Sequence, residues 1–464
     1  MRRVGARVGP RVATLFAVAC LTTTPTTALA YRTPSFARQY RTTCSTCHTA
    51  APKLNMLGEA FRLNGYRLPD NGALIKREAG LPLGDDAWKE LWPRAIWPGE
   101  IPVVPPISVR IQSDAVVRRG SERASAWMFR FPSEVSLLAA TTLGEGVNAF
   151  LEAEWTPDRG LDVVQARVGF QDPLPFLPHR ALNLWVGKQN PTLFTFADRK
   201  IDQMGRLAYY WQEFGMADLR LSDPERGRTL QSANASRLPD PQPAVEFNGL
   251  AGGRAYYSVA IAQVADDTSR DRSAPMRATY KLRYKWGGLR LDGLYDSGRG
   301  PRPNGGGQLL DRAVVLEHFG QLASASAPDG GNYAHRSFGV AVRLLNGPLD
   351  AGMGAVWRRD DDPWGTGVAA DMTSVFGKAE YLVFPWLIGS LRAERFDAGS
   401  PAARRAGFTR GTDRRTRVAP GVVMLIRQNI RLVAEGELGA PARAPADGIR
   451  PRPVIFGMRL DVIF

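Results

Sequence analysis

The 464-residue chain contains only three cysteines and four histidines, and no uninterrupted apolar run approaches the length of a membrane-spanning helix. The low cysteine count excludes a disulfide-stabilised scaffold, and the lack of long apolar runs excludes a bundle of transmembrane helices. Charge is not clustered either, because no block of five or six like charges accompanies the formal net charge of +15. Without a helix-turn-helix, zinc-finger or RNA-binding signature, the basic residues do not predict nucleic acid as a partner.

The first thirty residues have the pattern of a secretory signal peptide. Four arginines lie within the first eleven positions, an apolar stretch follows from Val12 to Cys20, and Ala28-Leu29-Ala30 has the small-x-small form of a cleavage site. Removing residues 1–30 lowers the net charge to +11, because the segment holds four arginines and no acid. Cys20 follows Ala17-Val18-Ala19, which leaves lipoprotein processing as an alternative. We therefore expect an exported protein.

Beyond that segment only two cysteines remain, in the run Cys44-Ser45-Thr46-Cys47-His48. In an exported protein, two thiols spaced C-x-x-C can each add to a haem vinyl group while the adjacent histidine ligates the iron. A zinc site is one alternative, but zinc takes about four ligands. A redox dithiol is another, but it has no need of the histidine. The motif therefore predicts one covalent haem c, attached at Cys44 and Cys47, with His48 as the proximal iron ligand.

The rest of the chain, from about Pro105, alternates apolar and polar side chains in segments of about ten residues bounded by turn residues. In 276–286 the apolar and aromatic residues fall on one face and basic residues on the other. The last segment, 454–464, alternates in the same way and ends on Phe464. A soluble sandwich would also alternate, but aromatic residues at the ends of an apolar band are typical of an outer-membrane barrel with a polar lumen.

The fold class predicted is all-β, a transmembrane β-barrel of about sixteen antiparallel strands with a small α-helical N-terminal c-type cytochrome segment. Short turns and long loops would then occupy opposite ends of the barrel, with 190–242 and 299–331 as long external loops. The strands are expected near 105–118, 126–142, 147–156, 162–170, 182–189, 244–251, 254–265, 276–286, 289–298, 332–345, 349–359, 373–384, 388–397, 414–427, 430–441 and 453–464.

Residues 31–104 are predicted to form the haem segment and a linker, followed by the barrel at 105–464. Apolar residues at helical spacing predict a helix over 53–64, ended by Gly65, and a second short helix is expected at 85–92. The proline-rich stretch 98–106 is expected to be a stiff linker. Since so short a segment cannot build an adequate core alone, we expect it to lie in the barrel lumen.

Several short motifs of the haem segment recur together in one known family. They are Phe36-Ala37-Arg38-Gln39, the motif from Cys44 to His48, Pro52-Lys53-Leu54-Asn55, Gly58-Glu59-Ala60-Phe61 and Leu63-Asn64-Gly65-Tyr66. With these motifs, roughly residues 34 to 68 resemble the family of fused monohaem cytochromes and porins, whose best-known members are outer-membrane iron(II) oxidases, whereas the barrel agrees only in length, alternation and ending. The resemblance implies electron transfer across the bacterial outer membrane, from an extracellular donor such as Fe(II) to a periplasmic c-type cytochrome or other soluble carrier.

The sixth haem ligand stays open. Met56 is a candidate because a methionine sulfur raises the potential of the iron, although an apolar packing role is the alternative. More distant candidates are His179, His318, His335 and Met204.

Further expectations concern the function and partners. Asp360, Asp361 and Asp362 are expected to lie in an external loop and are candidates for attracting ferrous ions there. Trp88, Trp92 and Trp97 are candidates for contacting a periplasmic carrier. The first hypothesis for the function is electron transfer, with iron(II):cytochrome c oxidoreductase as a candidate activity. The alternative is a porin-type solute channel with a haem-bearing plug or sensor, and a third hypothesis is a soluble periplasmic haem enzyme.

Overall fold

The computed structural model describes most of the strands, their short turns and parts of the N-terminal segment, and residues Thr33–Phe464 belong to one structural unit. The described residues are 36–37, 40, 42–50, 53–66, 81–82, 100–101, 107–119, 126–142, 146–158, 160–174, 176–189, 219–223, 228–232, 241–263, 276–301, 332–361, 369–399, 413–427, 429–440 and 454–463.

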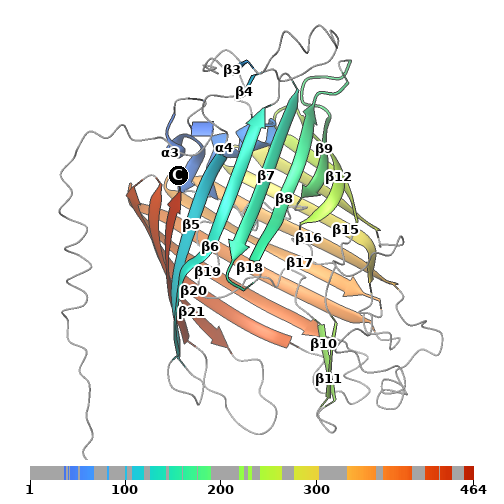
Figure 1. Ribbon diagram of the computed structural model, residues 1–464. Coiled ribbons are helices and arrows are strands. Elements are labelled where there is room, and N and C mark those ends of the chain that lie inside the picture. Colours follow the sequence, from blue (N-terminus) through green and yellow to red (C-terminus); the bar gives the residue numbers. More distant parts are fainter. Residues whose placement is uncertain are drawn as a thin grey trace, which may run out of the picture. The chain divides into compact units, whose positions relative to one another are not determined.

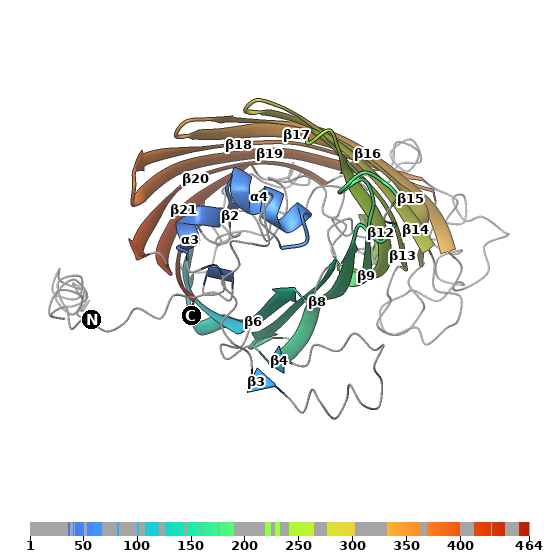
Figure 2. The ribbon, with the colours of Figure 1, turned by 90° about the horizontal axis from the view of Figure 1, so that it is seen from above.

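Sixteen antiparallel strands form a closed barrel, in which β22 pairs with β5 to complete the circle (Figures 1 and 2). Closure leaves no unpaired edge, which is what a sheet needs in order to cross a bilayer. The strands are β5 (Ile107–Arg119), β6 (Ala126–Thr142), β7 (Val147–Thr156), β8 (Gly160–Gln171), β9 (Asn183–Gln189), β12 (Gln242–Ala251), β13 (Ala255–Gln263), β14 (Met276–Trp286), β15 (Leu289–Pro301), β16 (Asn332–Asn346), β17 (Leu349–Asp360), β18 (Ala370–Phe384), β19 (Leu387–Gly399), β20 (Asp413–Arg427), β21 (Ile430–Ala440) and β22 (Val454–Ile463).

The connections at one end of the barrel are short, and we call this the short-turn end. It includes the turns between β12 and β13, β14 and β15, and β16 and β17. Gly287 and Gly347 occupy two of these turns at φ values of 56° and 54°, a left-handed conformation that glycine adopts without strain. In outer-membrane barrels the short turns face the periplasm, so this end is assigned to the periplasmic side.

The outer surface of the barrel is apolar and aromatic. On β14, Leu282 and Trp286 expose 60% and 71% of their surface, whereas Arg277 and Thr279 on the opposite face expose 1% each. Phe338 and Trp357, on neighbouring strands, stack on the outside with ring centroids 5.9 Å apart. A closed sheet with this outer surface is built to contact lipid.

The lumenal face is polar and consists largely of arginine–carboxylate pairs between neighbouring strands. Arg459 Nε donates to Asp114 Oδ1 at 2.6 Å, which links β22 to β5 where the barrel closes. Arg343 binds both carboxylate oxygens of Asp350, at 2.7 and 2.6 Å. Such two-point pairs satisfy the buried charges and fix the register of neighbouring strands.

The N-terminal segment folds into short elements at the short-turn end of the barrel. They are α3 (Cys44–Cys47), β1 (His48–Ala50), β2 (Lys53–Leu54) and α4 (Met56–Leu63), with β1 and β2 paired antiparallel. We call residues 36–66 the plug. Two further short strands, β3 (Leu81–Pro82) and β4 (Glu100–Ile101), pair with each other. No helix within the described part of the chain is long and apolar enough to span a bilayer.

The predicted fold class is confirmed, and the sixteen predicted strands agree with the observed ones within three residues at each boundary. Two details were wrong. The predicted loop 190–242 contains a hairpin of β10 (Leu219–Asp223) and β11 (Arg228–Ser232). The helix predicted over 53–64 begins only at Met56, because Lys53 and Leu54 pair with β1. The helix expected at 85–92 and most of the loop at 299–331 lie outside the described residues.

Candidate functional site

The two predicted haem-attachment cysteines lie on a single helical turn. α3 begins at Cys44 and ends at Cys47, and residues three positions apart lie on the same face of a helix. Both side chains are partly buried, and neither forms a disulfide. Burial raises the pKa of each thiol above its ordinary value, so both are protonated at neutral pH. His48 follows directly as the first residue of β1.

Asn55 holds the cysteine turn against helix α4. Its side-chain Oδ1 accepts the backbone N–H of Gly58 at 2.9 Å, which caps the helix. Its Nδ2 donates to the carbonyl of Thr46 at 3.0 Å, and its backbone N–H donates to the carbonyl of Cys47 at 2.9 Å. One residue therefore fixes both the start of α4 and the backbone of the cysteine motif.

Gly58 allows α4 to lie directly on the cysteine turn. A Cβ atom at this position would approach the carbonyl oxygen of Cys47 to 2.0 Å, closer than real Cβ contacts allow. Glycine is therefore required here for close packing rather than for an unusual backbone conformation. Gly65, with φ at +64°, ends the helical segment as predicted.

An aromatic cluster supplies the apolar core of the plug. Phe36 contacts Phe61 edge to face, with centroids 5.0 Å apart, and stacks on Tyr66 at 5.1 Å. Tyr40 contacts Phe61 at 5.4 Å and donates its hydroxyl to the carbonyl of Tyr66 at 3.1 Å. These contacts join the residues before the cysteine motif to those after α4, so the motif lies on a loop closed by packing.

Glu59 ties the plug to one side of the lumen. This α4 side chain is only 3% exposed, and its carboxylate pairs with Arg290 on β15 and with Arg343 on β16, the latter at 2.8 Å. Arg343 is held in turn by Asp350 at 2.6 Å. Since both arginines lie near the short turns, the pair of contacts places α4 within the mouth of the barrel (Figure 2).

Tyr66 ties the plug to a different part of the wall. Arg167 on β8 donates to the Tyr66 hydroxyl at 2.9 Å, and the Tyr66 ring stacks on Phe150 of β7 at 6.1 Å. The guanidinium of Arg167 also lies 4.3 Å from the ring centroid of Trp185 on β9. The expectation that the haem segment occupies the lumen therefore agrees with these contacts and with those of Glu59.

The structure places the candidates for the sixth haem ligand in different parts of the chain. Met56 begins α4 and is 41% exposed, beside the gap between the plug and the wall. His335 lies within β16, 2% exposed, with Nε2 at 3.3 Å from Asp296. His179 lies in the β8–β9 connection and binds Asp172 at 2.5 Å. His318 and Met204 lie outside the described residues.

The acidic residues proposed to attract ferrous ions do not form one exposed group. Asp360 is fully buried at the end of β17 and bonds Arg358 at 2.8 Å, so the expectation that it is an exposed loop acid was wrong. Asp361 is exposed and pairs with Arg359 at 3.1 Å. Asp362, together with Trp88, Trp92 and Trp97, lies outside the described residues. Within those residues, no group of three or more metal-ligating side chains was found.

No role was assigned from the sequence to the residues that hold the plug against the barrel wall. Glu59 and Tyr66 were noted only as parts of motifs shared with a family, and Arg343 was not singled out. The alternation of apolar and polar residues is a partial signal, since the polar face of the predicted strand 289–298 includes Arg290, which is 4% exposed in the lumen.

Comparisons with known proteins show likeness of fold. No protein family and no curated protein sequence matches the chain. The structure is similar to an anion-selective porin of Comamonas acidovorans, with a TM-score of 0.51 and 9% identity over 77% of this chain and 98% of that one. It is also similar to the outer-membrane channel DcaP of Acinetobacter baumannii, with a TM-score of 0.49 and 12% identity over 77% and 96% of the two chains. Closure, polar lumen and apolar outer surface together make this chain a porin-like barrel of the bacterial outer membrane.

Proposed function

We propose that this chain is an outer-membrane barrel whose lumen holds a plug that carries one covalent haem c. The observation that supports this most strongly is the ion pairing of Glu59 with Arg290 and Arg343, because it anchors the helix packed on the Cys44–Cys47 turn to the lumenal wall. The haem-attachment motif and the membrane-spanning sheet thereby belong to one folded unit.

The residues at the site fit a haem group. Cys44 and Cys47 share one face of a turn, and His48 directly follows, as covalent attachment and iron ligation require. The neighbouring wall also departs from the polar pattern of the lumen, since Ile388, Val423 and Val433 form a buried apolar cluster on β19, β20 and β21. Both ribbon views place α3 on the side of β20 and β21 (Figures 1 and 2). An apolar wall beside the cysteine turn suits a porphyrin, which supplies an iron that accepts and donates single electrons.

A porin-type channel whose passage is controlled by the plug is the function that the architecture supports best. The barrel is closed and its wall is lined with ion pairs, while α4 stands in its mouth. We expect purified protein in liposomes to admit small solutes, and replacement of Cys44 and Cys47 by serine to leave that flux measurable. If the liposomes stay sealed to every small solute, with and without the substitutions, the channel function is wrong.

Electron transfer is the second candidate function, favoured by the position of the cysteine turn at the short-turn, periplasmic end. One haem cannot bridge a hydrocarbon layer of ~30 Å, so an extracellular donor such as Fe(II) would have to enter the lumen and a periplasmic carrier would have to dock at the mouth. Ferrous iron added to the oxidised, detergent-purified protein should then produce the α band of reduced haem within mixing time. An α band that appears with dithionite but never with ferrous iron would rule out Fe(II) as donor.

A further inference from the structure

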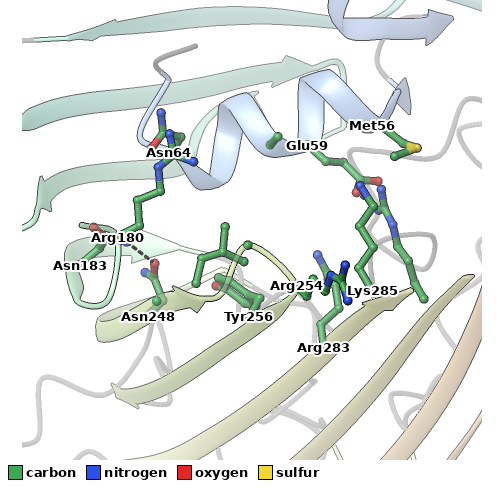
Figure 3. A pocket seen from close by; sticks show the side chains of 15 residues that line it. Met56, Glu59, Asn64, Arg180, Asn183, Asn248, Arg254, Tyr256, Arg283 and Lys285 are labelled. Carbon is green, nitrogen blue, oxygen red and sulfur yellow. Dashed lines mark hydrogen bonds and ion pairs between the residues drawn. The ribbon is translucent and has the colours of Figure 1, made fainter. Parts of the chain in front are cut away.

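A cavity lies between helix α4 and the wall formed by β12 to β15 at the short-turn end (Figure 3). Met56, Glu59 and Asn64 line it from the plug. Its empty volume is about 710 Å³, part of which is open to solvent. The cysteines and His48 do not line it, so it is distinct from the haem-attachment turn.

The lining of this cavity carries five basic side chains and a single carboxylate. The basic residues are Arg180, Arg254, Arg283, Lys285 and Arg290, and the carboxylate is Glu59. Glu59 is already engaged by Arg290 and Arg343, and Arg283 Nε donates to Asp292 Oδ1 at 2.6 Å. The positive charge around the cavity therefore exceeds the negative charge.

Two of the basic residues at the cavity have no carboxylate partner among the residues that the structure describes. Neither Arg254 nor Lys285 forms an ion pair with any residue that the structure describes, although most lumenal arginines elsewhere in the barrel do. Their backbones are joined, with Lys285 N–H donating to the Arg254 carbonyl at 3.0 Å, so both side chains start from neighbouring points of the wall. Figure 3 shows them on the strand side of the cavity, below α4.

A buried amide adds a neutral donor to the same cavity. Asn248 on β12 is 0% exposed, and its Oδ1 accepts a hydrogen bond from Asn183 Nδ2 at 3.3 Å. Its own Nδ2 has no partner within the described part of the chain. A buried donor without an acceptor is costly, and an acceptor atom from a ligand would remove that cost.

We propose that this cavity binds an oxyanion with at least two negative charges, of the phosphate or polycarboxylate class. Arg254 and Lys285 supply the charge, and Asn248 supplies a neutral hydrogen bond. Two sources offer this chemistry. One is a dissolved oxyanion that enters from the short-turn end, and the other is the pair of propionates on the proposed haem.

Titration of the purified, detergent-solubilised chain with inorganic phosphate, followed by phosphorus NMR line broadening at low ionic strength, tests the proposal. We expect saturable binding that the double variant Arg254→Gln, Lys285→Gln weakens roughly a hundredfold or more, since each of the two lost charge-assisted hydrogen bonds is worth about tenfold in affinity. The control variant Arg130→Gln, Lys188→Gln removes two basic residues that pair with Asp158 and Asp162, away from the cavity, and should bind phosphate as the unaltered chain does.

The dissolved oxyanion and the haem propionates are distinguished by repeating the titration on the chain with Cys44 and Cys47 replaced by serine. Binding by both chains supports a dissolved oxyanion, and binding by the haem-free chain alone supports the propionates as the occupant. Absence of binding in both chains, or equal affinity in the Arg254 and Lys285 double variant, overturns the proposal. Because the haem-free chain is tested directly, failure of haem attachment leaves this result interpretable.

Discussion

Replacing Glu59 with alanine is expected to unseat the plug and raise the ion conductance of the barrel. The substitution leaves Arg290 and Arg343 buried in the mouth without the carboxylate that joins them. Removing one partner of a buried ion pair costs roughly 3–5 kcal/mol, which shifts the equilibrium from seated to released plug by about a hundredfold or more. Single-channel recording in planar bilayers measures the effect as a larger or more frequent open level.

Two further variants make this prediction specific. Tyr66→Phe removes the hydrogen bond from Arg167 and keeps the ring stacking on Phe150, so its effect should be in the same direction and smaller. Asp158→Ala removes an exposed carboxylate paired with Arg130 and should leave conductance unchanged. A Glu59→Ala barrel that conducts like the unaltered protein would show that α4 does not obstruct the lumen.

Replacing both Cys44 and Cys47 with alanine is expected to abolish covalent haem while the barrel still assembles. The sixteen strands are held by their own pairing and by lumenal ion pairs between strands, such as Arg431 on β21 with Asp461 on β22 at 2.5 Å. Haem staining of the denatured chain and its circular dichroism measure the two outcomes separately.

Ser45→Ala provides the matched control for the cysteine substitutions. Ser45 lies between the two cysteines, and within the described residues its exposed side chain bonds only Thr43, at 2.8 Å. This variant should keep the haem and its spectrum. Haem retained covalently by the double alanine variant, or lost from the serine variant, would contradict the assignment of the two thiols.

The barrel could be predicted almost completely because its determinants repeat in every strand. In a lipid-facing sheet, most outward positions are apolar and most inward positions are polar, so the alternation in a segment such as 276–286 predicts both the strand and its two faces. Glycines at the short turns, such as Gly287, then mark the boundaries. The strand bounds and the strand count followed from this local rule, without knowledge of any distant contact.

The seat of the plug could not be predicted in the same way. Glu59 and Arg343 are 284 positions apart, and no local pattern distinguishes an arginine that binds the plug from one that binds a neighbouring strand. The prediction for Asp360 was wrong for a related reason. Asp360 is the last residue of β17, and its buried charge is compensated by Arg358 on the same strand. The predicted start of the helix at Lys53 was also wrong, because Lys53 and Leu54 pair with β1 despite the helical spacing of the apolar residues.

The intact mass of the chain extracted from outer membranes tests the central claim most directly. We expect a chain that lacks the first thirty residues and carries the added mass of one haem, which stays attached when acidified acetone removes any haem that is not covalently bound. A chain recovered from the same membranes at its bare polypeptide mass, colourless and with both cysteines open to alkylation after unfolding, would contradict it.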